Sequence, residues 1–205
     1  MSLLNSLVLS LTLIVGLASA VSTVGCSSAE KNHETEVGPR MSDLEYRIMV
    51  EKNTKTAQKY EGFYNTLEVR STFINSDVQA AILQKQSEIL QWDSKTAQAA
   101  REKMFQENSN STKFFVSFFV PTRRLNDLHK PNTIWKIYLE ANGEKYEGKA
   151  TKRTEPLEAL QALFPAHSRW AIPYDVTFSV PLSAVDKSNV KLTFTSSVAQ
   201  AELNF

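Results

Sequence analysis

The segment Lys113–Pro121, KFFVSFFVP, has apolar side chains at both odd and even positions. Successive side chains of a β-strand point to opposite faces of the sheet. A strand with this composition therefore needs cover on both faces, which is typical of a central strand. The chain must build a sheet and place a second layer over it, and a long helix is the natural candidate for that layer.

A second segment, Gly62–Ile74, alternates between apolar and polar residues. The apolar residues are Phe63, Leu67, Val69 and Phe73, all at odd positions. This alternation predicts a half-buried strand.

The C-terminal third also predicts strands. Ile134–Glu140 alternates in the same way, and Asn142 and Gly143 supply the positive φ angles of a tight hairpin turn. We therefore expect a hairpin with 144–153 as its return strand. Three further short strands are expected at Tyr174–Val180, Val190–Thr195 and Ala199–Phe205.

Three segments have helical features. Met41–Tyr60 predicts a helix with Ser42 and Glu45 as a capping box, although EYRIMVEK within it also fits a short strand. A stripe of apolar residues predicts one long helix over residues 76–106, with neither Pro nor Gly to interrupt it. Thr154–Phe164 predicts a short helix, with a Pro suited to its first turn.

These elements predict a single, mainly β domain over residues 42–205. About seven strands with one long inserted helix favour an antiparallel β-sandwich, immunoglobulin-like in its arrangement. The alternative is an α+β antiparallel sheet with the long helix across one face.

The N-terminus predicts where the protein is located. Met1 to Ala29 contains no charged side chain and no histidine, and Leu7–Ala20 is apolar over the length of an export-signal core. Cys26, the only cysteine of the chain, follows this run, and the polar residues Ser27–Arg40 come after it. A cut after Ala20 and an uncleaved helix in the inner membrane are alternative interpretations.

The run TVGC, Thr23–Cys26, resembles the lipobox of bacterial lipoproteins. The resemblance implies that residues 1–25 are a signal peptide, that Cys26 is lipidated, and that residues 26–41 form a flexible tether. It also implies anchoring in the lipid bilayer, and Ser27 after the cysteine implies the outer membrane, facing the periplasm or the cell surface. Several acyl chains hold a protein stably where one does not.

The rest of the sequence contains few features of an enzyme. The chain has 23 Lys and Arg against 22 Asp and Glu, and a net charge of +1 is too small to attract nucleic acid. His33, His129 and His167 form no pattern of metal ligands, and no glycine-rich phosphate motif predicts a cofactor. We expect a non-catalytic binding or structural module; the rival is an exported hydrolase that uses Ser168 or His167 with Asp175.

Two sets of residues are candidates for binding an envelope protein or a glycan. The first is basic: Arg123, Arg124 and Lys130 in one loop, with Lys149, Lys152 and Arg153 at a hairpin end. The second is aromatic: Trp135 and Trp170, together with Trp92. The alternative interpretation is that the cations are solvated and the tryptophans belong to the core.

Overall fold

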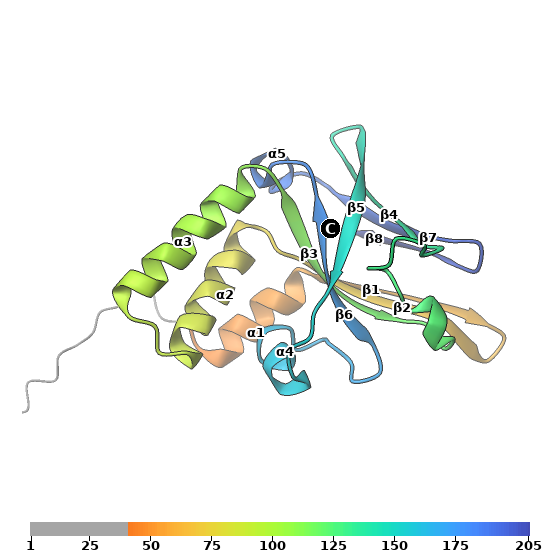
Figure 1. Ribbon diagram of the computed structural model, residues 1–205, viewed down its shortest axis with the longest axis horizontal. Helices are drawn as coiled ribbons and strands as arrows, with labels where there is room; N and C mark the ends of the chain where they lie inside the picture. The colour runs from red at the N-terminus through yellow and green to blue at the C-terminus, as the bar shows by residue number, and fades with distance from the viewer. Residues whose placement is uncertain (1–40) are drawn as a thin grey trace, which may run out of the picture. The chain divides into compact units, whose positions relative to one another are not determined.

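The computed structural model describes residues 41–205. Eight antiparallel strands form one sheet in the order β1-β2-β3-β6-β5-β4-β7-β8. The two edge strands, β1 and β8, lie beside each other, so the sheet curls nearly into a barrel (Figure 1). The strands are β1 (Thr54–Glu61), β2 (Tyr64–Phe73), β3 (Thr112–Phe119), β4 (Lys136–Ala141), β5 (Glu144–Lys152), β6 (Ile172–Phe178), β7 (Lys191–Thr195) and β8 (Gln200–Asn204). Cys26, the signal peptide predicted over residues 1–25 and most of the tether predicted over 26–41 lie outside the described residues.

The prediction of a mainly antiparallel β fold is confirmed, but the structure does not show a sandwich or an immunoglobulin-like arrangement. β5 pairs with β4 on one side and with β6 on the other, which joins the strands into one continuous sheet. β1 is an additional strand, in a segment where the sequence predicted helix as far as Tyr60. Its side chains are mostly exposed, so Thr54–Glu61 lacks the apolar alternation by which strands are predicted.

The interior of the curled sheet is filled with side chains. Phe114, Phe118 and Phe194 are fully buried there, and Phe118 also packs edge-on against Trp135 at 5.0 Å between ring centroids. The hairpin predicted around Asn142 and Gly143 is confirmed, with both residues at positive φ. The core therefore lies inside the sheet, contributed by residues from β2 to β8.

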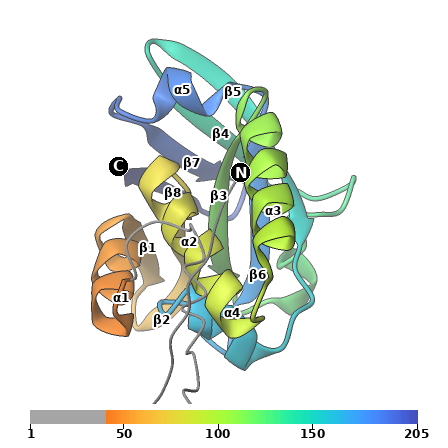
Figure 2. The same ribbon diagram turned by 90° about the vertical axis from the view of Figure 1, so that its left-hand side faces the viewer.

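β3 is covered on both faces, as its composition predicts. Phe114, Val116 and Phe118 belong to the interior, whereas Phe115 points to the outer face and joins a second buried cluster with helical residues. That cluster includes Tyr46, Val50, Leu160 and Phe164. Helices supply the cover over the outer face, in front of the sheet in Figure 2.

The helices are α1 (Asp43–Lys52), α2 (Ser76–Ile89), α3 (Ser94–Asn108), α4 (Leu157–Leu163) and α5 (Leu182–Val185), with a short 3-10 turn η1 (Arg123–Leu125). The capping box predicted for α1 is present: the backbone N–H of Glu45 donates to Ser42 Oγ at 3.3 Å, and the Ser42 N–H donates to Glu45 Oε2 at 2.8 Å. A strand over EYRIMVEK was the wrong alternative.

The prediction of one long helix over residues 76–106 was wrong, because two helices stand in its place. Gln91 has φ of 48°, which ends α2, and Asp93 begins α3 by accepting a hydrogen bond from Thr96 N at 2.7 Å. Aspartate is favoured as an N-cap and disfavoured inside a helix, so Asp93 divides the segment without Pro or Gly.

Candidate functional site

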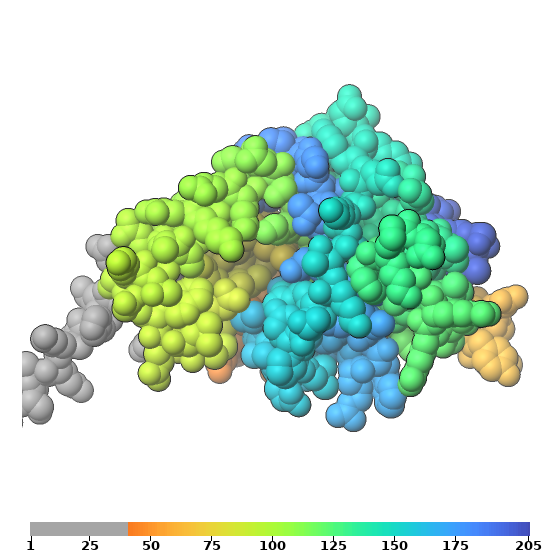
Figure 3. Space-filling view, viewed as in Figure 1, coloured from red at the N-terminus to blue at the C-terminus, as the bar shows by residue number. Residues whose placement is uncertain are grey.

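A cleft of about 380 Å³ lies between the two helices α2 and α3 and the outer face of the sheet. α2 presents Gln79, Ile82, Leu83 and Gln86 to it, at the i, i+3, i+4 and i+7 spacing of one helical face. α3 presents Ala100, Lys103, Met104, Glu107 and Asn108 in the same way. In the space-filling view the two helices lie beside the segment that carries α4, and the cleft opens between them (Figure 3).

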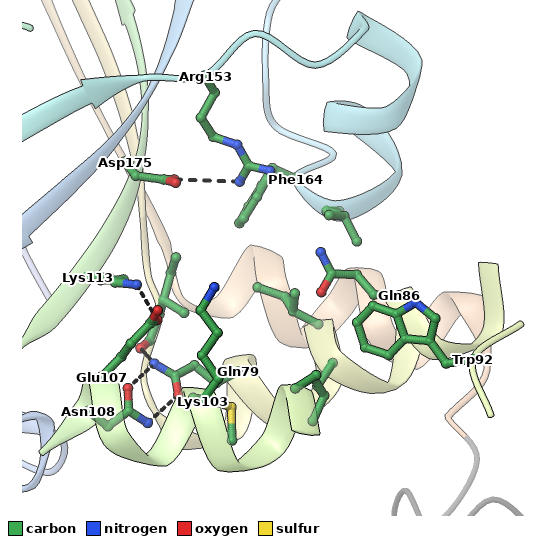
Figure 4. A pocket seen from close by; sticks show the side chains of 16 residues that line it. Gln79, Gln86, Trp92, Lys103, Glu107, Asn108, Lys113, Arg153, Phe164 and Asp175 are labelled. Atoms are coloured by element: carbon green, nitrogen blue, oxygen red, sulfur yellow. Dashed lines mark hydrogen bonds and ion pairs between the residues drawn. The ribbon is translucent and has the colours of Figure 1, made fainter. Parts of the chain in front are cut away.

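The opposite wall of the cleft contains a charged pair above an aromatic stack. The guanidinium of Arg153 lies 3.5 Å from Oδ1 of Asp175, and its NH2 group is 2.5 Å from Oε1 of Glu155. The Arg153 guanidinium also lies 5.5 Å from the centre of the Phe164 ring, which stacks on Phe115 at 3.8 Å. This stack fixes α4 to β3, and it places Phe164 and Arg153 at the cleft (Figure 4).

Burial shapes the electrostatics of this wall. It raises the pKa of Asp175 above its usual value, although the positive charge of Arg153 acts in the opposite direction. For Arg153, burial acts to lower the pKa, but the hydrogen bond to Glu155 and the charges of Asp175 and Glu155 outweigh it and raise the pKa. Arg153 therefore stays charged at this wall.

The floor of the cleft is polar at one end and satisfied by internal hydrogen bonds. The side-chain amides of Gln79 and Asn108 bond each other in both directions, at 2.9 and 2.5 Å. Lys113 of β3 donates to Oε2 of Glu107 at 2.5 Å. Lys103 extends from α3 toward the space below Arg153 (Figure 4) and has no ion-pair partner among residues 41–205.

His167 and Ser168 are not joined to Asp175 as a catalytic triad requires. His167 is buried, and its Nδ1 shares a hydrogen bond with Ser117 Oγ over 2.9 Å. The Ser168 hydroxyl accepts a hydrogen bond from Trp170 N at 3.3 Å, while Asp175 faces Arg153. The rival hydrolase has no support from this arrangement.

The register of the sheet brings other predicted residues to one end of the curled sheet. Phe118 pairs with Ile172 and Lys136 with Thr195, so the segments just beyond these pairs share that end. We call it the loop end; it consists of the β1–β2 turn, residues 120–135, residues 168–171 and residues 196–199. Of the residues predicted at the hairpin end, Lys152 ends β5 here, Arg153 lines the cleft, and Lys149 lies further along β5.

Exposed aromatic and basic side chains gather at the loop end. Arg123, Arg124 and Lys130 are exposed, and Trp170 is 74% exposed. Three more aromatic side chains, Tyr60, Phe63 and Tyr64, are exposed at the β1–β2 turn, which projects in Figure 3. Arg169, Ile134 and Val198 add to the same end.

Trp135 is the exception among the predicted binding residues. It is 2% exposed, its Nε1 donates to the carbonyl of Leu125 at 2.7 Å, and its ring packs on Phe118. It fixes the base of the loop that carries Arg123 and Arg124, so its role is structural. Trp92 is half-buried at the cleft, and His129 is exposed beside Tyr174.

No family model, no curated protein sequence and no solved structure matches the chain. Within residues 41–205, no helix is both long and apolar enough to cross a membrane. In the same range, His, Cys, Asp and Glu side chains form no group of three or more that could hold a metal ion.

Proposed function

We propose that the protein is a lipid-anchored binding protein of the bacterial cell envelope. The observation that carries this proposal is the single cysteine, Cys26, which stands at the end of an uncharged apolar leader and before a polar segment. Acyl chains on this residue anchor the protein in the bilayer, and Ser27 directly after the cysteine favours the outer membrane. The domain over residues 42–205 is the part that binds.

The loop end is the proposed surface for an envelope partner. It combines exposed aromatic rings, such as Phe63 and Trp170, with the cations Arg123, Arg124 and Lys130. Large exposed apolar side chains at one end of a domain favour an interaction site, and arginine and aromatic residues are enriched in protein interfaces. A partner with an acidic, partly apolar surface fits this composition.

The lipid anchor is tested by replacing Cys26 with Ala in the full chain. We expect the variant to lose incorporation of radiolabelled palmitate and to leave the membrane fraction, whereas Ser27→Ala keeps both. Intact-mass measurement of the mature protein should show residues 26–205 with acyl chains added to Cys26. A mass that includes residues 1–25, or an unmodified thiol, would contradict the proposal.

The partner surface is tested separately in cells, by placing a photo-crosslinking amino acid at Phe63 or Trp170 of the full chain. We expect an adduct of defined mass that Arg123→Glu with Arg124→Glu reduces at least fivefold. Lys187→Glu, which reverses one exposed cation near α5, is the control for charge reversal away from the loop end and should leave the adduct unchanged. An adduct insensitive to both changes would remove the loop end as the binding surface.

A further inference from the structure

The cleft beside α2 and α3 is lined by apolar and charged side chains, and the partner surface proposed at the loop end does not include it. We infer that it binds a single acyl chain that ends in a carboxylate, with the chain along α2 and α3 and the carboxylate at Lys103. This inference does not depend on the anchor at Cys26 or on the loop end, because it concerns a different surface.

The apolar part of the cleft fits a hydrocarbon chain. Ile82, Ala100 and Met104 are only half-buried, although they face the cleft and not the outer surface of the helices. The rest of the apolar lining consists of Ile74, Leu83, Trp92, Leu163 and Phe164. A volume of about 380 Å³ lies at the lower end of the range for ligand sites, and an unbranched thioether such as that of Met104 adapts to a chain of variable shape.

The charges of the cleft favour an acid. Lys103, Lys113 and Arg153 line it, against the two carboxylates of Glu107 and Asp175. Each carboxylate already faces a cation, Lys113 at 2.5 Å from Glu107 and Arg153 at 3.5 Å from Asp175. Arg153 also pairs with Glu155, which lies outside the lining. Lys103 is then the one cation of the lining without an ion-pair partner among residues 41–205, and a ligand carboxylate would pair with it.

The polar groups favour an acyl chain over a peptide. A peptide lying in the cleft would need hydrogen-bond partners for its own amides, because an unpaired buried amide is costly. The amides of Gln79 and Asn108 already bond each other in both directions. A hydrocarbon chain makes no such demand along its length.

The test uses the full chain in phospholipid vesicles and a photoactivatable hexadecanoic acid that carries a diazirine in its chain. After irradiation, the labelled peptides are identified by mass spectrometry, and only label within residues 76–108 counts as occupancy of the cleft. We expect this label to be present with the acid, to be at least fivefold weaker with the amine of equal chain length, and to be displaced by unlabelled hexadecanoate.

Variants identify the head-group site. Lys103→Gln should reduce the label at least fivefold and Lys103→Arg should keep it, whereas Lys149→Gln, an exposed lysine of β5, should leave it unchanged. Ala100→Trp should block the chain itself, and circular dichroism checks that each variant is folded. The inference is overturned if folded Lys103→Gln labels as well as the unchanged chain, if the amine labels equally, or if an apolar peptide with a free carboxylate displaces the acid and hexadecanoate does not.

Discussion

Nδ1 of His167 and Oγ of Ser117 lie 2.9 Å apart, in a place where both residues are less than 5% exposed. Burial lowers the pKa of His167, and the positive charge of Arg153 acts in the same direction. The folded protein therefore keeps the ring neutral, while the unfolded chain takes up a proton as the pH falls below about 6.5.

The stability that His167 contributes is complete above about pH 6.5 and is lost as the pH falls toward the lowered pKa. We expect the free energy of unfolding to fall in this range by at most about 1.4 kcal/mol per pH unit because of His167. His167→Gln should remove this slope in urea denaturation measured between about pH 5 and 7. His129→Gln, an exposed histidine, serves as the control, and an unchanged slope in His167→Gln would contradict the assignment.

The Phe115–Phe164 stack should dominate the attachment of α4 to the sheet. Both rings are 2% exposed, and they lie nearly parallel, at an angle of 4°. Phe164→Ala should lower the free energy of unfolding by about 3–5 kcal/mol, because it leaves a cavity beside Phe115. Phe105→Ala, at a 61% exposed ring on α3, should change it by less than about 0.5 kcal/mol. Equal effects of the two substitutions in chemical denaturation would count against the stack.

The separation of α2 from α3 should depend on Asp93. Asp93→Ala removes the hydrogen bond from Thr96 N and should cost about 1 kcal/mol, while Asp93→Asn keeps an acceptor and should cost only a few tenths. Gln91→Gly should instead stabilise the protein by about 1 kcal/mol, because glycine adopts a positive φ without strain. Thermal unfolding of the three variants tests both expectations, and a stable Asp93→Ala variant would mean that the cap is unimportant.

Gly148 of β5 should tolerate no side chain. A Cβ atom there would lie 2.6 Å from Cε1 of Phe178, whose ring is fully buried. Gly148→Ala should therefore lower the free energy of unfolding by about 1–3 kcal/mol through overpacking. Lys149→Ala, at the exposed neighbour on the same strand, should stay within about 0.5 kcal/mol, and equal effects of the two substitutions would count against the close contact.

The strands that could be predicted are those with one or two buried faces. β2 alternates between apolar and polar residues, and β3 is apolar at both odd and even positions. The β4–β5 hairpin has Asn142 and Gly143 at its turn. Each pattern depends on the local environment of its residues. β1 could not be predicted from such a pattern, because its side chains are mostly exposed. Its strand conformation depends on hydrogen bonding to β2 and not on burial. The single curled sheet depends on which strands pair at a distance, which short-range patterns do not encode.

The sequence predicted several residues of the loop end but not the cleft, for a similar reason. Arg123, Arg124, Lys130 and Trp170 were chosen by chemical type, and the register of the sheet gives them a common end. Trp135 has the same chemical type as Trp170, but a hydrogen bond to Leu125 and the Phe118 ring hold it in the core. The cleft was missed; its only signal was the mixture of Lys103, Glu107 and Asn108 with Met104 on one face of α3.

α3 has one buried residue, Ala97, among its fifteen. Its removal from the outer face would break no strand pairing and would leave the interior of the sheet intact. Amide protons of α3 should therefore exchange with solvent through local opening, at a free energy well below that of global unfolding. Local opening of α3 would therefore widen the cleft while the strand pairings of the sheet stay in place.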